Sequence, residues 1–282
     1  MTTKNFVLEY SAEADEALGL GVRRISSKLI IRSDFRQAFL EKHRSQSDRA
    51  GEPIGTFQAD MSDQALSNIL VKANAMIVPE QPPAKGEGPG STVITIRFEE
   101  GARKITRIFT SGDMSILSAV EGLINDLDLL SGQVERHPLS ALQAMIEYKS
   151  GPYPYFLLTL KNIGQTRICF ADPRFLPQGD PDCWAGAQVA ELPEEKPGMT
   201  APPLQWKQVP LEMPAHPAPT EPIVIEPGKS FSAKTVTWQN LKPNAPFLAQ
   251  GVYSDYTGPA EIAGVYRIRG ATFSEGMEFI AK

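Results

Sequence analysis

Apolar and polar residues alternate at the start of the chain, where Phe6, Leu8 and Tyr10 take every second position. This period of two is typical of a strand with one buried face. A small-residue, Gly-containing segment at 11–21 and a charged segment at 41–53 are expected to be loops. Similar β-rich segments predict further strands at 25–32, 35–40 and 54–58.

A helical period replaces the alternation after residue 60. Asp60 or Ser62 is the expected N-cap, because either side chain can accept a hydrogen bond from the first turn. Pro79 ends the segment and begins a Pro- and Gly-rich loop at 79–90. The apolar positions, three or four residues apart, are Ala65, Leu66, Ile69, Leu70, Ala73 and Met76.

A hairpin and a second helix follow. Residues 92–98 and 103–109 alternate, and a short Glu-Glu-Gly-Ala connection joins them. Asp113 is the expected cap of the helix and Gly132 its expected stop. The apolar stripe of this helix contains Ile116, Leu117, Val120, Leu123, Ile124, Leu127 and Leu130.

These elements predict an α+β N-terminal domain at 1–135, in which two amphipathic helices cover one face of a sheet. The side chains that we expect in its core include Leu66, Ile69, Leu123 and Leu127.

The second half of the chain is rich in strands and turns. The phrase Leu158-x-Leu160-x-Asn162-x-Gly164 alternates and then supplies turn residues. The segment 139–149 fits either a short turn or a strand. Strands are predicted at 154–161, 165–171, 221–225, 230–237, 249–256, 264–269 and 276–281. This number and spacing are typical of an all-β, Ig-like sandwich, which we place at 145–282.

A Pro-rich insertion at 173–227 interrupts these strands and holds 13 of the chain's 24 prolines. Proline lacks a backbone donor and is excluded from central strands, so no strand is predicted between 173 and 220. Trp184 and Trp206 lie within the insertion. We expect their rings to anchor it against the sandwich.

Composition narrows the class of protein. A length of 282 residues favours two domains, and a net charge of −5 without a basic patch argues against a nucleic-acid partner. No apolar stretch is long enough to predict a membrane span, and no signal peptide is visible. We expect a cytoplasmic protein, with a periplasmic or secreted location as the alternative. Cys169 and Cys183 are either two reduced thiols or one disulfide.

Candidate chemistry is sparse along the chain. The three histidines fall one to a region, without the H-E-x-x-H, C-x-x-C or paired spacing that zinc sites use. Pro227-Gly-Lys-Ser230 precedes a strand instead of a helix, so it is interpreted as a turn, not a phosphate loop. We therefore expect no metal, no cofactor and no enzymatic activity.

Aromatic residues are the best candidates for a recognition surface. Tyr153 and Tyr155 flank prolines, which fits either packing at the edge of the core or an exposed patch. Tyr and Trp are enriched at the energetic centres of protein interfaces. The partner-binding candidates are therefore Tyr153, Tyr155, Trp184 and Trp206.

The order of elements in residues 1–131 resembles the emfourin family, small bacterial protein inhibitors of M4 metallopeptidases such as protealysin. The charged stretch 32–53 departs from the family pattern as an insertion. The matching pieces are the opening strand Asn5–Tyr10, the phrase Phe57-x-x-Asp60-Met-Ser62, the helix Asp63–Met76, the hairpin Val93–Phe109 and the final helix Met114–Leu130.

The second half resembles bacterial Ig-like domains through its L-x-L-x-N-x-G phrase and the later Pro227-Gly228 turn. Together the two resemblances imply a protein that docks on a folded partner, most concretely an inhibitor of a metallopeptidase. The alternative is a structural, accessory or immunity-type protein with a non-peptidase partner.

Overall fold

The computed structural model describes residues 5–15, 23–44, 51–76, 92–110, 114–177, 183–193, 203–215, 221–238, 242, 244–257 and 259–280. Within these ranges the protein is mostly β, with two α-helices and one short 3-10 helix. Backbone contacts divide the chain into two compact units. Unit 1 comprises Met1–His43 and Thr56–Leu139, and unit 2 comprises Arg44–Gly55 and Ser140–Lys282. The described part of Arg44–Gly55, which we had placed in the first domain, therefore belongs to unit 2.

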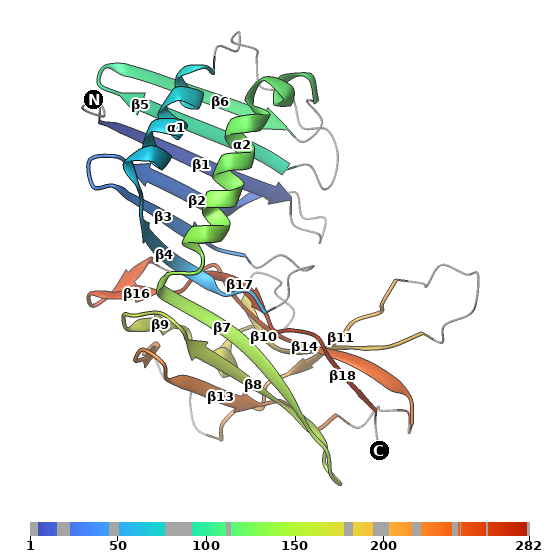
Figure 1. Ribbon diagram of the computed structural model, residues 1–282. Coiled ribbons are helices and arrows are strands. Elements are labelled where there is room, and N and C mark those ends of the chain that lie inside the picture. The colour runs from blue at the N-terminus through green and yellow to red at the C-terminus, as the bar shows by residue number, and fades with distance from the viewer. Residues whose placement is uncertain are drawn as a thin grey trace. The chain divides into compact units, whose positions relative to one another are not determined.

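An antiparallel sheet forms the body of unit 1, with its strands in the order β3-β2-β1-β5-β6 and with β4 beside β3 (Figure 1). All the strands predicted for this part of the chain are present. The predicted loop at 11–21 was wrong at its start, because the first strand continues to Asp15; its remainder and the 79–90 loop lie outside the described residues. The strands are β1 (Phe6–Asp15), β2 (Arg23–Arg32), β3 (Gln37–Lys42), β4 (Ile54–Asp60), β5 (Thr92–Glu100) and β6 (Arg103–Thr110).

Two helices, α1 (Asp63–Asn74) and α2 (Met114–Val134), lie across one face of this sheet (Figure 1). Ser62 is the N-cap of α1, and its hydroxyl accepts a hydrogen bond from the backbone N–H of Ala65 at 3.2 Å. The amine of Lys72 joins the helices by an ion pair of 2.6 Å with Asp126. The predicted core side chains Leu66, Ile69, Leu123 and Leu127 are all buried. The side chains of Ile116 and Leu117 lie outside the described residues.

Gly132 does not end α2, as we had predicted, because the helix continues to Val134. Its neighbourhood is open: a Cβ at this position would meet no atom within 4 Å, and the backbone has no positive φ. We expect Gly132→Ala to raise the free energy of unfolding by about 0.5–1 kcal/mol, since alanine loses less backbone entropy in a helix. Urea denaturation followed by circular dichroism measures this change, and a destabilised variant would contradict the open environment.

The strands of unit 2 fall into three groups. One group has the order β13-β8-β7, a second has the order β11-β10-β14-β17 with β18 also paired to β14, and a third has the order β12-β9-β16-β15. The strands are β7 (Pro138–Lys149), β8 (Tyr155–Asn162), β9 (Ile168–Phe170), β10 (Cys183–Glu191), β11 (Lys207–Pro210), β12 (Ile223–Ile225), β13 (Ser230–Lys234), β14 (Pro246–Asp255), β15 (Glu261–Ile262), β16 (Val265–Arg267), β17 (Gly270–Phe273) and β18 (Met277–Ile280).

The Pro-rich insertion contains two strands that the sequence did not predict. β10 is an interior strand, paired with β11 on one side and β14 on the other. The prediction failed because the prolines flank 183–191 and none lies within it. Trp184 is buried in β10, whereas Trp206 is 39% exposed, so only Trp184 acts as the expected anchor. The segment 139–149, for which the sequence fitted either a short turn or a strand, forms a strand, β7.

Two hydrophobic clusters fill unit 2. The first surrounds Phe170 and Tyr253, whose rings meet edge to face with centroids 5.7 Å apart. The second cluster comprises Phe156, Ala187, Val189, Val209, Trp238, Phe247 and Ala249.

A buried ion pair lies at the end of β14. The guanidinium of Arg267 donates to the fully buried carboxylate of Asp255 at 2.8 Å, and the backbone N–H and hydroxyl of Thr257 donate to the other carboxylate oxygen. Burial, and then the charge of Asp255, raise the pKa of Tyr253 well above its ordinary value, so its phenol stays protonated. The hydroxyl of Tyr253 and the Nε of Arg267 have no hydrogen-bond partner within the described residues.

The two cysteines lie beside this ion pair. Cys183 pairs with Asp255 in the β10–β14 register, and Cys169 pairs with Arg267 in the β9–β16 register. Both thiols are buried and are not joined in a disulfide. Burial raises the pKa of Cys169, which makes its thiolate form, the reactive species, harder to reach.

Candidate binding pocket

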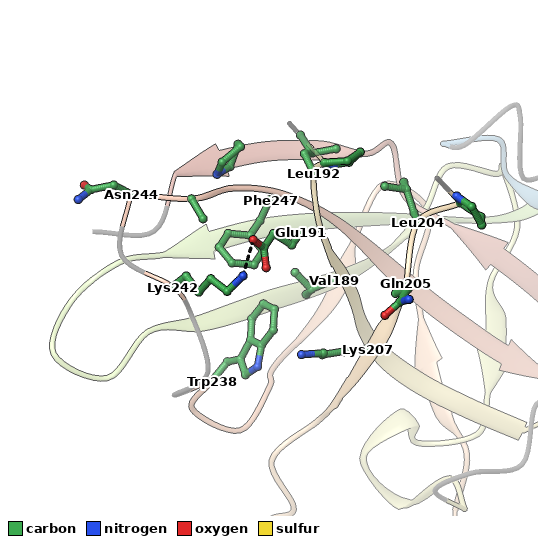
Figure 2. A pocket seen from close by; sticks show the side chains of 14 residues that line it. Val189, Glu191, Leu192, Leu204, Gln205, Lys207, Trp238, Lys242, Asn244 and Phe247 are labelled. Atoms are coloured by element: carbon green, nitrogen blue, oxygen red, sulfur yellow. Dashed lines mark hydrogen bonds and ion pairs between the residues drawn. The ribbon is translucent and has the colours of Figure 1, made fainter. Parts of the chain in front are cut away.

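A pocket of about 710 Å³ opens in unit 2 beside the second hydrophobic cluster (Figure 2). It lies where the carboxyl end of β10 and the start of β11 approach the start of β14. This volume is in the range of pockets that bind ligands or side chains of a partner. It is lined by Val189, Glu191, Leu192, Pro193, Pro203, Leu204, Gln205, Lys207, Trp238, Lys242, Asn244, Ala245, Pro246 and Phe247.

Aromatic rings form the apolar wall of the pocket. The Trp238 ring meets Phe247 edge to face, with centroids 5.8 Å apart, and contacts Phe156 at 5.9 Å. The backbone N–H of Trp238 donates to the carbonyl of Pro154 at 3.0 Å, which fixes the start of the segment that carries the ring. Trp238 is only 8% exposed, so the wall is preformed rather than assembled on binding.

Charged side chains stand at the rim. Figure 2 shows Trp238 between Lys242 and Lys207, with an ion pair of 2.8 Å joining Lys242 to Glu191. Within the described part of the chain, the amine of Lys207 has no ion-pair partner. Among the described lining residues, two amines therefore stand against one carboxylate, which gives this part of the rim an excess of positive charge next to an apolar surface.

This arrangement is suited to binding an amphipathic group. The rings and prolines can cover an apolar side chain, and the free amine can pair with a carboxylate. Glu191 is already held by Lys242 in an exposed ion pair, which adds little stability and orients the rim.

The sequence-predicted binding residues lie elsewhere in unit 2. Tyr153 is 73% exposed in the turn before β8, and Tyr155 begins that strand half-buried. Trp184 belongs to the core, since it is 4% exposed and offers almost no surface to a partner. Trp206 is partly exposed and directly precedes the pocket residue Lys207. None of these four aromatics lines the pocket.

Sequence reasoning missed Trp238, Phe247 and Lys207. The predicted strand at 230–237 stops one residue before Trp238, and Phe247 precedes the predicted strand at 249–256. The signal in the sequence was that an aromatic residue, Trp238 or Phe247, lies next to an end of each predicted strand.

Among the described residues, no group of three or more His, Cys, Asp or Glu side chains could hold a metal ion. No helix in the described part of the chain has the length and apolar character needed to cross a membrane. Comparisons with protein-family models, with curated proteins and with solved structures find no match to this chain.

Proposed function

We propose that the protein is a non-enzymatic protein-binding protein whose unit 2 pocket holds a segment of a folded partner. The observation that carries this proposal is the pairing of a preformed aromatic wall, Trp238 and Phe247, with the positive rim. Buried aromatic anchors surrounded by polar groups are the usual energetic centres of protein interfaces. Because the wall is already packed, a partner would lose little free energy to reorganisation of this site.

The most concrete partner is a metallopeptidase, which the protein would inhibit by docking. The support is the order strand, helix, hairpin and helix in unit 1, together with the emfourin resemblance of residues 1–131. In this proposal unit 1 is the α+β domain of that family and unit 2 is an Ig-like sandwich that carries the pocket. The alternative is a structural, accessory or immunity-type protein that uses the same pocket for a non-peptidase partner.

Titration of a thermolysin-like M4 peptidase with the full chain tests the inhibitor proposal. We expect slow-onset inhibition that is complete at one inhibitor per enzyme, because two folded surfaces must dock. Reversing the rim charge with Lys207→Glu and Lys242→Glu together should weaken inhibition by at least about tenfold, as loss of a charge-assisted contact does. Lys229→Glu, an exposed lysine in the turn before β13, is the matched control and should leave inhibition unchanged.

No inhibition by the wild-type chain would remove the peptidase as partner. The alternative would then be supported only by a non-peptidase partner whose binding is lost in the double charge reversal and kept in Lys229→Glu. Partner binding that is unchanged in both the double charge reversal and Lys229→Glu would show that the partner does not bind at the pocket.

A further inference from the structure

Within the described residues, the outer edge of β11 is open at Gln208, beside the pocket. β11 is the end strand of the order β11-β10-β14-β17, and it pairs with β10 from Val189↔Lys207 to Gly186↔Pro210. The carbonyl of Val209 faces β10, since a Cβ on Gly186 would lie 2.4 Å from its oxygen. In an antiparallel strand the N–H and C=O groups of successive residues point to opposite sides. Those of Gln208 therefore point away from β10.

The outer edge of β11 is paired only at its far end. The backbone N–H of Val236 donates to the carbonyl of Pro210 at 2.9 Å, and that of Glu212 donates to the carbonyl of Lys234. Continued pairing would next join Gln208 to Trp238. Instead the N–H of Trp238 donates to Pro154, so the chain leaves β11 at this point. Within the described residues, the outward backbone groups of Gln208 have no partner.

Residues from both sides of this divergence line the pocket. Lys207 and Gln205 line it from the β11 side, and Trp238 lines it from the other side (Figure 2). An open backbone edge, an apolar wall and an unpaired amine are therefore adjacent. Recognition by strand addition uses the same three features: backbone hydrogen bonds supply affinity, and a pocket selects alternate side chains.

We infer that the pocket binds an extended, acidic segment of the partner as an added strand on the outer edge of β11. Backbone groups of the segment pair with the N–H and C=O of Gln208. One side chain, apolar, packs on Trp238, and a carboxylate two positions along the segment, on the same face, pairs with Lys207. The inference rests on the proposed function and names the chemistry of the segment that the pocket holds.

A competing interpretation is that Lys207 and Pro210 protect the edge. Lysine and proline on edge strands discourage unwanted pairing. Protection accounts for the charge, but it does not account for an aromatic-walled pocket directly beside the open edge. The two interpretations differ in their outcome, because a protected edge would reject an added strand.

Selection from a random dodecapeptide library displayed on phage, with the full chain as bait, tests the inference. The expected winners alternate, with an aromatic or aliphatic residue two positions from Asp or Glu. A synthetic winner should lose at least about tenfold in affinity for Lys207→Glu and keep its affinity for Lys229→Glu. Gln208→Pro removes the outward N–H and should cause a similar loss.

Backbone N-methylation of the same peptide keeps the test independent of how the variants fold. Two peptides are made, one N-methylated at the odd positions and one at the even positions, so that each lacks the N–H donors of one of its two edges. Strand addition predicts a loss of affinity of at least about tenfold for the peptide methylated on the edge that faces β11, and little change for the other. Equal binding by both methylated peptides, with sensitivity to Lys207→Glu retained, would overturn the added strand and leave the pocket's binding role standing. Winners insensitive to Lys207→Glu, or no winners, would overturn the acidic-strand inference; the peptidase titration then decides the proposed function separately.

Discussion

Replacing Arg267 with Met is expected to lower the free energy of unfolding of unit 2 by about 3–5 kcal/mol, because it leaves the Asp255 carboxylate buried without its ion-pair partner. Asp255 is fully buried, and Arg267 donates to it at 2.8 Å. All three tryptophans lie in unit 2, so urea denaturation followed by their fluorescence reports on this unit.

The control is Lys242→Met, which breaks the exposed ion pair with Glu191 and should cost less than about 1 kcal/mol. Combining Arg267→Met with Asp255→Leu should recover much of the loss, because it removes both buried charges. A single Arg267→Met variant as stable as the control would mean that Asp255 is not desolvated in the folded protein.

Gly55→Ala is expected to destabilise the protein by about 3 kcal/mol or more, through steric overlap added to backbone strain. Gly55 has a φ of +131°, which only glycine adopts readily, and a Cβ there would lie 2.1 Å from the carbonyl oxygen of Ser140. The neighbour is backbone, so it cannot turn aside as a flexible side chain would.

Gly101→Ala separates strain from overlap. Gly101 has a φ of +60° in the β5–β6 turn, and a Cβ there would meet nothing within 4 Å. It should cost only the strain, about 1–2 kcal/mol. Thermal unfolding of both variants gives the comparison, and equal losses would contradict the close approach of Gly55 to Ser140.

Elements with a strong local period were predictable from sequence. The face of α1 follows from Leu66 and Ile69, and Ser62 caps the helix because its side chain reaches the first-turn N–H. In contrast, β10 was not predicted, because the interpretation of 173–227 rested on the proline content of the whole segment, although 183–191 contains no proline. The prolines lie on either side of 183–191, and the strand between them is stabilised by pairing with β14, which local composition does not show.

The pocket could not be predicted in the same way. Its lining comes from 189–193, from 203–207, and from Trp238, Lys242 and Asn244–Phe247, and pairing between strands brings these parts of the chain together. Trp238 carries no local pattern that separates a core ring from a pocket wall, since it belongs to the second cluster and also lines the pocket. Trp238 lines the pocket because the chain leaves β11 after Val236, and the sequence does not show this change of hydrogen-bond partner.

Hydrogen exchange of the full chain, alone and with a saturating amount of a selected peptide, is the most direct check that the pocket and the outer edge of β11 bind a partner segment. We expect slowed amide exchange at Lys207–Val209 and around Trp238 and Phe247 when the peptide is bound, with unit 1 amides unchanged. Slowed exchange confined to other surfaces, with Lys207–Val209 and the Trp238 region exchanging as in the unbound protein, would contradict this binding site.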